Sequence, residues 1–224
     1  MTDSLVSVAI DGPVGAGKSS IAREAAKRLG YIYVDTGALY RAIGLHCHRN
    51  GVDMLNPSAI AEGSDGVQPE IRLIDGVQHI YLAGEDVSEA IRMPEISMAA
   101  SAVSAVPEVR AALLDLQRNL AKTNSVIMDG RDIGTVVLPD ATVKIFLTAL
   151  PEIRARRRYD ELCAKGVDTT FEAVLDDLNK RDYNDSHRAT APLKQADDAV
   201  LADTSGLDFE QSCELVCSII KERL

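Results

Sequence analysis

The chain has 224 residues, of which 46% are hydrophobic, and its formal net charge at pH 7 is −10. A chain of this size can bury a large core as one domain with small insertions. No apolar run approaches the ~20 residues that cross a bilayer, and the first residues lack the basic start of a signal peptide. We therefore expect a soluble, cytoplasmic protein that binds no membrane and, being acidic, no nucleic acid.

Short apolar runs recur along the chain, and most are continuous rather than alternating, which is typical of strands buried on both faces of a parallel sheet. They are LVSVAI (5–10), YIYV (31–34), SVIM (125–128), TVKIFL (142–147) and AVLA (199–202). Helical patterns lie between them. This alternation predicts an α/β domain of three layers.

The first apolar run leads into a glycine-rich stretch that fits the pattern G-x-x-x-x-G-K-[ST] between a strand and a helix. Its residues are Gly12, Pro13, Val14, Gly15, Ala16, Gly17, Lys18, Ser19 and Ser20. Glycines let successive N–H groups point inward, and the helix dipole adds partial positive charge there. Lys18 supplies a full charge to the β- and γ-phosphates, and the Ser19 hydroxyl is placed to bind Mg²⁺. The stretch predicts binding of a nucleoside triphosphate.

The segment between the second and third apolar runs departs from the strand–helix alternation. IRLIDGVQHIYLAGEDVS (71–88) indicates a β-hairpin that turns at Asp75 and Gly76. An alanine- and serine-rich stretch follows, and VPEVRAALLDLQRNLAK (106–122) then indicates a helix with Pro near its start. We expect this segment to be an insertion into the α/β domain.

Polar residues follow the second and third predicted strands, at the sheet edge where open α/β sheets bind ligands. They are Asp35, Thr36 and Arg41 in a strand–turn–helix segment, and Asp129, Arg131 and Asp132. Asp129 could reach the Mg²⁺ of a bound nucleotide directly or through water. The alternative for Arg131 and Asp132 is a tight turn with a surface ion pair.

Two basic helices are predicted further along the chain, joined by AKGVDTT. The first carries Arg154, Arg156, Arg157 and Arg158, and the second carries Arg181, Asp185 and Arg188. The second set is spaced by four and three residues and shares one face if the helix persists. Such helices are typical of a mobile cap that closes over phosphates and excludes water. Solvated charged faces are the alternative.

Three classes of nucleotide-binding protein are open at this point: a small-molecule kinase, a GTPase switch and an ATP sensor without turnover. Asn179 to Asp182 spell the guanine-reading motif NKxD, and Asp203 to Gly206 spell DxxG. The first lies in a helical pattern and the second comes too late in the chain, so we interpret both as coincidence. Several arginines without an evident general base favour a kinase whose acceptor is itself a phosphate, because a phosphate monoester with a second pKa near ~6 is already a charged nucleophile.

The four cysteines form no CxxC pair, and reduced thiols fit a cytosolic protein. A helical stripe near the C-terminus predicts that two of them pack in the core; it comprises Phe209, Cys213, Val216, Cys217, Ile220 and Leu224. His46, Cys47 and His48 lack partner ligands at useful spacing, so we expect no zinc there.

At nearly its full length the chain resembles the bacterial cytidylate (CMP) kinases. The stretches that carry the resemblance are AIDGPVGAGKSS, VDTGALYRA, GEDVSEAIR, ASAVSAVPEVRAALLDLQR, DGRDIGTVVLPDA, KIFLTALPEIRARRR, RDYNDSHRATAPL and DAVLADTS. The resemblance implies transfer of phosphate from ATP to CMP or dCMP with Mg²⁺. It also implies an adenylate-kinase-like P-loop fold with a five-stranded parallel sheet. One departure is Leu150, where Ser is frequent before Pro151; this change could loosen the helix cap.

The resemblance divides the chain into three parts and assigns roles by position. The core is about 1–62, 106–150 and 190–224, the monophosphate-binding insertion about 63–105, and the lid about 151–189. The P-loop from Gly12 to Ser20 would bind ATP, with Arg157 of the lid, and Ser19 and Asp129 would serve Mg²⁺. The acceptor would be held by Thr36, Arg41, Arg131, Arg181 and Arg188, its cytosine by Ser101, Arg110 and Asp132, and its sugar by Asp185. The groups expected to act in phosphoryl transfer are Lys18, Arg131, Arg154, Arg158, Arg181 and Arg188.

Other P-loop kinases, for uridylate, thymidylate or shikimate, are the nearest enzymatic alternatives, and a nucleotide-binding regulator is the alternative from another class. The DGRDIGT stretch and the insertion argue against the first group. Lys18, Ser19 and Asp129 argue against the second. No heptad pattern is present, so we expect a monomer.

Overall fold

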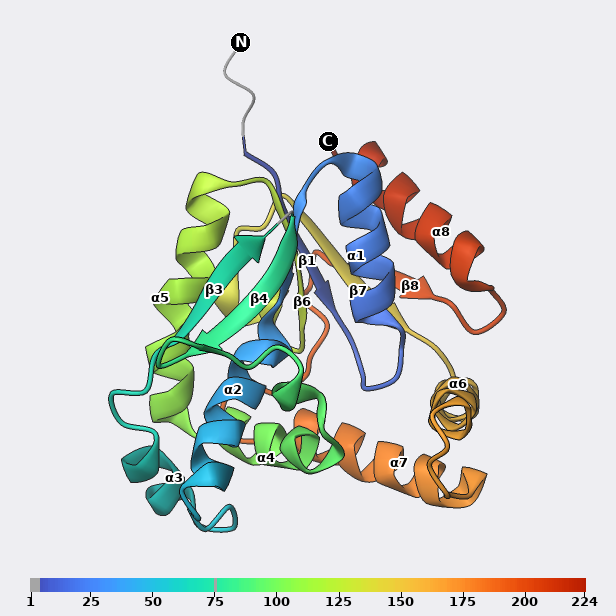
Figure 1. The fold of residues 1–224 in the computed structure, drawn as a ribbon. Helices are drawn as coiled ribbons and strands as arrows, with labels where there is room; N and C mark the ends of the chain where they lie inside the picture. Colours follow the sequence, from blue (N-terminus) through green and yellow to red (C-terminus); the bar gives the residue numbers. More distant parts are fainter. Residues whose placement is uncertain (1–4, 75) are drawn as a thin grey trace.

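The computed structural model describes residues 5–74 and 76–224 and has a parallel sheet of five strands at its centre (Figure 1). The strands are β1 (Ser7–Asp11), β2 (Ile32–Asp35), β6 (Val126–Gly130), β7 (Val143–Thr148) and β8 (Val200–Asp203). Their order across the sheet is β2-β6-β1-β7-β8, and every pair is parallel. The apolar runs therefore predict all of these strands correctly, within two residues at each end.

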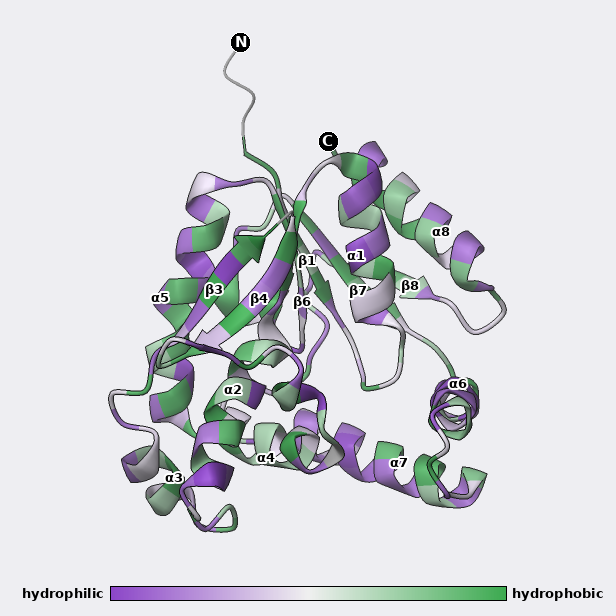
Figure 2. Cartoon of the chain, viewed as in Figure 1, coloured by the Kyte–Doolittle hydropathy of each residue, from purple (hydrophilic) through white to green (hydrophobic). Residues whose placement is uncertain are grey.

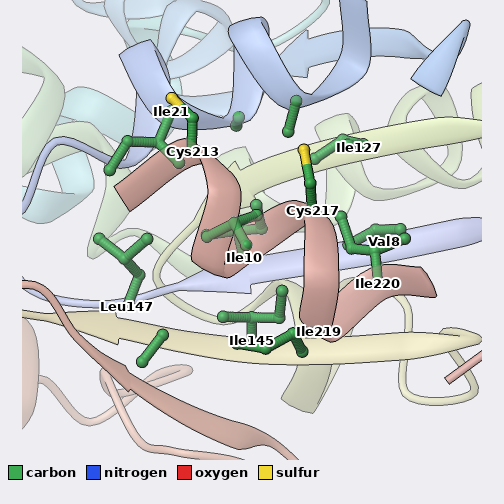
Figure 3. Close-up of a cluster of buried hydrophobic side chains, with 14 of the residues drawn as sticks. Val8, Ile10, Ile21, Ile127, Ile145, Leu147, Cys213, Cys217, Ile219 and Ile220 are labelled. Atoms are coloured by element: carbon green, nitrogen blue, oxygen red, sulfur yellow. The ribbon is translucent and has the colours of Figure 1, made fainter. Parts of the chain in front are cut away.

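Helices cover both faces of this sheet, because successive strand residues point to opposite sides. Val8 and Ile10 pack with α1 (Lys18–Leu29) and α8 (Phe209–Glu222), as Figure 3 shows. Ala9, between them, packs on the other side in a cluster that includes residues of α5 (Pro107–Thr123). The predicted three-layer α/β/α arrangement is confirmed.

Helix α8 confirms most of the predicted C-terminal stripe. Cys213 and Cys217 are buried in the cluster with β1 and α1 (Figure 3), and α8 carries both hydrophobic and hydrophilic residues (Figure 2). The prediction is wrong at the two ends of the stripe, where Phe209 is 53% exposed and Leu224 is 60% exposed. The physical reason is position: Phe209 is the first residue of α8, and Leu224 lies beyond its last turn.

Between β2 and β6 the chain forms several helices and a small second sheet. Its elements are α2 (Thr36–Arg49), α3 (Pro57–Gly63), β3 (Pro69–Ile74), β4 (Val77–Leu82), β5 (Glu85–Asp86), a 3₁₀ turn (Ala90–Arg92) and α4 (Pro94–Ser104), followed by α5. Strands β3 and β4 are antiparallel, with Ile74 opposite Val77, which confirms the hairpin. Of the two predicted turn residues, Asp75 lies outside the described residues and Gly76 has a φ of 76°. The short third strand β5 and helix α4 were not predicted.

The chain between β2 and β6 has a hydrophobic core of its own. Leu39 and Ile43 of α2 pack there with Ile80 of β4 and Ile96 of α4. Helix α5 joins this core to the main sheet, because it contributes Leu113 here and Leu114 to the cluster on the sheet. In the described ranges no single helix is long and apolar enough to cross a membrane; α4 and α5 meet that criterion only as a pair, and the pair is bent by 95°.

Helices α6 (Pro151–Ala164) and α7 (Phe171–His187) lie together at the carboxyl end of the sheet, where Figure 1 draws them in orange. Helix α6 starts with a proline, and at the start of α7 the Thr170 hydroxyl accepts a hydrogen bond from the Ala173 N–H at 3.2 Å. Helix α7 persists to His187, so it carries Arg181 and Asp185, and Arg188 follows directly as its C-terminal cap.

Candidate active site

The P-loop connects β1 to α1 and needs glycine at its first position. Gly12 has a φ of 151°, and a Cβ there would lie 2.0 Å from the carbonyl oxygen of Leu147. Gly17 precedes the first helical residue in a left-handed conformation with a φ of 84°, and no side chain caps the helix. The first N–H groups of α1 are therefore left for another acceptor, which makes the loop suitable for an anion.

Lys18 is buried inside this loop, with an exposed fraction of 5%. Its Nζ donates a hydrogen bond to the carbonyl oxygen of Pro13 at 2.8 Å. Burial and, after it, the positive charge of Arg131 lower the pKa of Lys18 to about 7, although Asp129 and Asp11 oppose the shift. An anion bound in the loop would favour the charged form of this lysine.

Asp129, near the end of β6, is held from three sides. Its carboxylate accepts hydrogen bonds from the Ser19 hydroxyl and the Tyr33 hydroxyl, each at 2.8 Å. Its backbone carbonyl accepts one from the Thr36 hydroxyl, also at 2.8 Å. Burial raises the pKa of Asp129, and the nearby carboxylate of Asp35 adds to the shift. The sequence analysis did not predict Tyr33 as a site residue, because it lies in the run YIYV, which indicates only a buried strand.

Thr36 reaches Asp129 because α2 starts directly after β2. The Asp35 carboxylate caps this helix by accepting a hydrogen bond from the Ala38 N–H at 3.0 Å. The turn that we expected between the strand and the helix is absent, because Asp35 ends the strand and caps the helix at once. Arg41 lies in the second turn of α2, with its Nη1 3.6 Å from Oδ2 of Asp35.

Asp11, at the end of β1, joins the P-loop to the segment after β6. Its two carboxylate oxygens accept hydrogen bonds from the N–H groups of Ile133 at 2.8 Å and Gly134 at 2.7 Å. These residues begin a π-helical turn (Ile133–Val137) directly after Asp132. Burial raises the pKa of Asp11 to about 6, although both N–H groups favour the carboxylate. We missed Asp11, but its signal is that of Asp129: an acidic residue ending a buried strand.

Guanidinium groups from three segments gather beside the P-loop. Arg131 donates a hydrogen bond from Nε to Asp185 of α7 at 2.6 Å. Burial lowers the pKa of Arg181, and the nearby charges of Arg131 and Arg41 lower it as well. This crowding of positive charge is the electrostatic signature of a site that takes an anion.

A second charged cluster, buried in the protein, lies around Asp132. Its carboxylate contacts Arg110 of α5, and the Arg188 Nη2 lies 3.5 Å from it. Burial raises the pKa of Asp132, and the two arginines oppose that shift. Arg110 also donates a hydrogen bond to the carbonyl oxygen of Ser104 at 3.3 Å, and Arg188 donates one to the Ser104 hydroxyl at 3.4 Å. Ser104 was missed from the sequence, although it lies one helical turn after Ser101.

A cavity of about 200 Å³ adjoins this cluster. Its lining includes Tyr40, Arg110, Leu114, Val137 and Ala191. The site therefore combines one apolar wall with buried, directional polar groups, as pockets for small organic ligands commonly do.

Three other residues predicted for the site, Ser101, Arg157 and Arg158, make different contacts from those of the two charged clusters. The Ser101 carbonyl accepts a hydrogen bond from the Ser104 hydroxyl at 3.0 Å, and no polar contact of the Ser101 side chain is found among the described residues. Arg157 donates to the carbonyl oxygens of Thr204 at 2.7 Å and Leu207 at 3.2 Å, in the loop after β8. Arg158 pairs with Glu161 at 2.7 Å, and its side chain is 42% exposed.

Arg154 lies closer to the P-loop than the other arginines of α6. It is buried and donates hydrogen bonds to the carbonyl oxygens of Ala149 and Val14, each at 2.8 Å. Its third partner is Asp182 of α7, at 2.6 Å. Asp182 is a contact residue that the sequence indicated only as part of the apparent NKxD motif.

The fold and the site define a P-loop kinase. A Walker-type loop follows β1 of a parallel sheet, and a buried lysine lies within it. Arg131, after β6, lies near that lysine and near Arg181 of α7, and Arg181 in turn lies near Arg41 of α2. A protein that only bound a nucleotide would not need these converging positive charges.

The chain belongs to the cytidylate kinase family, whose sequence model, described as "Cytidylate kinase", matches residues 8–222. A cytidylate kinase of Caldicellulosiruptor bescii is 49% identical over 214 residues, which cover 96% of this chain and 95% of that protein. A cytidylate kinase of Rhodococcus opacus is 48% identical over 224 residues, which cover 100% of this chain and 98% of that protein. This protein is accordingly a nucleoside monophosphate kinase.

A solved structure supports the fold alone. An uncharacterized protein from Eubacterium ventriosum has a TM-score of 0.56 and 13% sequence identity, over 98% of this chain and 99% of that chain. At this identity the likeness extends to the arrangement of the sheet and helices and not to the substrate.

Proposed function

We propose that this protein transfers the γ-phosphoryl group of ATP to CMP or dCMP and releases ADP with CDP or dCDP. The observation that carries the proposal is that two phosphate-binding regions meet. Arg131 lies close enough to Lys18 of the P-loop and to Arg181 of α7 to lower the pKa of both. Family membership supports a cytidine nucleotide as the acceptor.

The chemistry needs no general base from the protein. The second pKa of a phosphate monoester is near ~6, so the acceptor is mostly a dianion at neutral pH. One of its oxygens attacks the γ-phosphorus, the bond to the β–γ bridging oxygen breaks, and ADP leaves. The protein has to align two polyanions and stabilise the charge of the transferring group. Lys18, Arg131 and Arg181 supply that charge, and we assign Thr36, Arg41 and Arg188 to the acceptor with them.

Recognition of cytosine rests on the cluster around Asp132. Cytosine presents a 4-amino donor where uracil presents a carbonyl oxygen. A carboxylate that faces this position would accept from cytosine and repel uracil, and buried polar sites discriminate strongly on this basis. We assign this role to Asp132 with Arg110 and Ser101, and we assign the sugar hydroxyl to Asp185.

Mg²⁺ is expected to enter with ATP. Mg²⁺ in such sites takes one or two protein oxygens together with substrate phosphates and water. The Ser19 hydroxyl and an Asp129 carboxylate oxygen lie 2.8 Å apart at the base of the P-loop, so the residues present fit such an ion. We propose Ser19 and Asp129 as its protein ligands, where the ion would offset phosphate charge.

We assign residues 151–189 to a lid and residues 63–105 to a monophosphate-binding insertion, in a monomer of the cytoplasm. Closure of the lid would exclude water and so limit hydrolysis of ATP. Arg154 already contacts the P-loop at Val14, and Arg157 contacts the loop after β8 at Thr204. Arg158 would have to leave Glu161 to reach a phosphate.

The test is ADP production with Mg-ATP against CMP, dCMP, UMP, AMP, GMP, dTMP and shikimate. We expect the highest kcat/KM with CMP or dCMP, and no turnover when a chelator removes Mg²⁺. Highest turnover with another acceptor would contradict the roles given to Ser101, Arg110 and Asp132. ATP binding without acceptor-dependent turnover would indicate a regulator.

A further inference from the structure

Asp182 of α7 contacts the P-loop directly. Its Oδ1 accepts a hydrogen bond from the backbone N–H of Val14 at 3.1 Å. Its Oδ2 accepts one from Arg154 of α6 at 2.6 Å, and Arg154 also donates to the carbonyl oxygen of Val14 at 2.8 Å. Both backbone polar groups of one P-loop residue are thus bonded to side chains of the two lid helices.

Apolar packing places the same elements against each other independently of these hydrogen bonds. The Val14 side chain packs on a small hydrophobic cluster of Ala155, Val174 and Leu178 from α6 and α7. At the next residue, a Cβ added to Gly15 would lie 3.2 Å from the Leu178 side chain. The P-loop therefore packs directly against both lid helices at Val14 and Gly15.

Helix α7 carries two functional faces at once. Leu178 and Asp182 are four residues apart and both contact the P-loop. The next positions around the helix, Arg181 and Asp185, face the arginine cluster of the acceptor region, where Asp185 bonds Arg131. A helix is rigid over one turn, so a shift of one face moves the other.

We propose that Asp182 is a positioning residue that couples the acceptor region to the P-loop through α7. An acceptor phosphate that binds Arg181 fixes the position of α7. Through its hydrogen bonds, Asp182 then fixes the positions of Val14 and Arg154. The proposal rests on the proposed function and deepens it. It also gives the aspartate of the apparent NKxD motif a role in this protein that does not involve reading guanine.

The test measures how strongly CMP promotes binding of a non-hydrolysable ATP analogue, by calorimetry with and without saturating CMP. In the wild-type protein we expect CMP to tighten analogue binding by about 5-fold or more. In Asp182→Ala we expect this factor to fall close to 1, while CMP alone binds within about 2-fold of its wild-type affinity, because the residues assigned to CMP are intact. Asp182→Asn keeps an oxygen for Val14 but loses the charge that holds Arg154, so its factor should be intermediate.

Asp176→Asn is the matched control, because Asp176 is an exposed aspartate of the same helix; its coupling factor should equal that of the wild type. If Asp182→Ala does not fold, Asp182→Asn decides the question. An undiminished factor in the Asp182 variants, or no coupling in the wild type, overturns the proposal. So does an equal loss of CMP affinity, which is what a merely structural role would cause.

Failure of the proposed function gives a different result. If the wild type binds the analogue but not CMP, the acceptor assignment is wrong. Hydrogen exchange then decides the role of Asp182, because the analogue alone should protect amides of α7 in the wild type. Loss of that protection in Asp182→Ala supports the coupling, and equal protection in both proteins overturns it.

Discussion

At the scale of single residues, Asp132, which we propose to bind the acceptor, lies between two arginines. Its side chain is 6% exposed, and those of Arg110 and Arg188 are each 8% exposed. At this depth the carboxylate of Asp132 and the two guanidinium groups balance one another's charge, so loss of one partner leaves a buried charge poorly compensated.

We predict that Arg110→Ala and Asp132→Ala each raise the KM for CMP by about 10-fold or more, since each removes a charge-assisted hydrogen bond. The KM for ATP should stay nearly constant, because neither residue contacts the P-loop. Arg49→Ala is a suitable control, because Arg49 pairs with Glu85 on the surface at 2.7 Å. Steady-state kinetics with each substrate varied in turn measures the split, and an unchanged KM for CMP in both variants would refute these roles.

Asp11 gives a prediction about stability and pH. Its pKa is raised from 3.8 to about 6 in the folded protein, so the folded state binds this proton more tightly than the unfolded state. The resulting stabilisation is fully present below about pH 4 and is lost as the pH rises through about 6. We expect the free energy of unfolding, relative to that of Asp11→Asn, to fall by up to about 3 kcal/mol between pH 4 and 7.

Urea unfolding of both proteins at several pH values measures that difference. Asp176→Asn again serves as a control on an exposed carboxylate. A difference that is independent of pH would show that Asp11 has no raised pKa in the folded state.

At the scale of elements, α6 is the helix whose start can be improved. Leu150 occupies the N-cap position with a φ of −52° and a ψ of 141°, makes no capping hydrogen bond from its side chain, and is 57% exposed. Because Leu150 is mostly exposed, replacing its side chain would remove little buried apolar surface. Because Leu150 stands where the resemblance leads us to expect serine, α6 begins without a side-chain cap.

Leu150→Ser should stabilise the protein by about 1 kcal/mol, because a serine hydroxyl can accept from a free N–H of the first turn. Leu150→Ala, which removes the leucine without adding a cap, isolates this effect. Chemical denaturation compares the two, and kcat should be unchanged in both. Equal stability of the serine and alanine variants would mean that no cap forms.

At the scale of the whole molecule, charge and packing favour a single copy in solution. The net charge of −10 opposes self-association, and both hydrophobic cores are closed by elements of the same chain. We predict a mass of 24.1 kDa by light scattering at physiological salt. A mass near twice that value would indicate a dimer, and repeating the measurement with CMP and an ATP analogue would show whether ligands change it.

The sequence determined the parts of this protein that depend on local pattern. Continuous apolar runs indicate buried parallel strands because both faces of each strand must leave water. The P-loop could be identified from eight positions, because the backbone conformation at Gly12 favours glycine and Lys18 places a cationic side chain inside the loop. The family could be identified from stretches such as DGRDIGTVVLPDA, and the match to the cytidylate kinase model over residues 8–222 confirms it.

Only the tertiary structure decided which distant residues meet. Tyr33 reaches Asp129 from the neighbouring strand, and Asp11 reaches Ile133 across 122 positions of sequence. Asp182 reaches Val14 across 168 positions because α7 folds back over the carboxyl end of the sheet. Contacts of this kind follow from strand order and helix packing, which join side chains without leaving any periodicity in the sequence, and for that reason pattern and spacing could not reveal them.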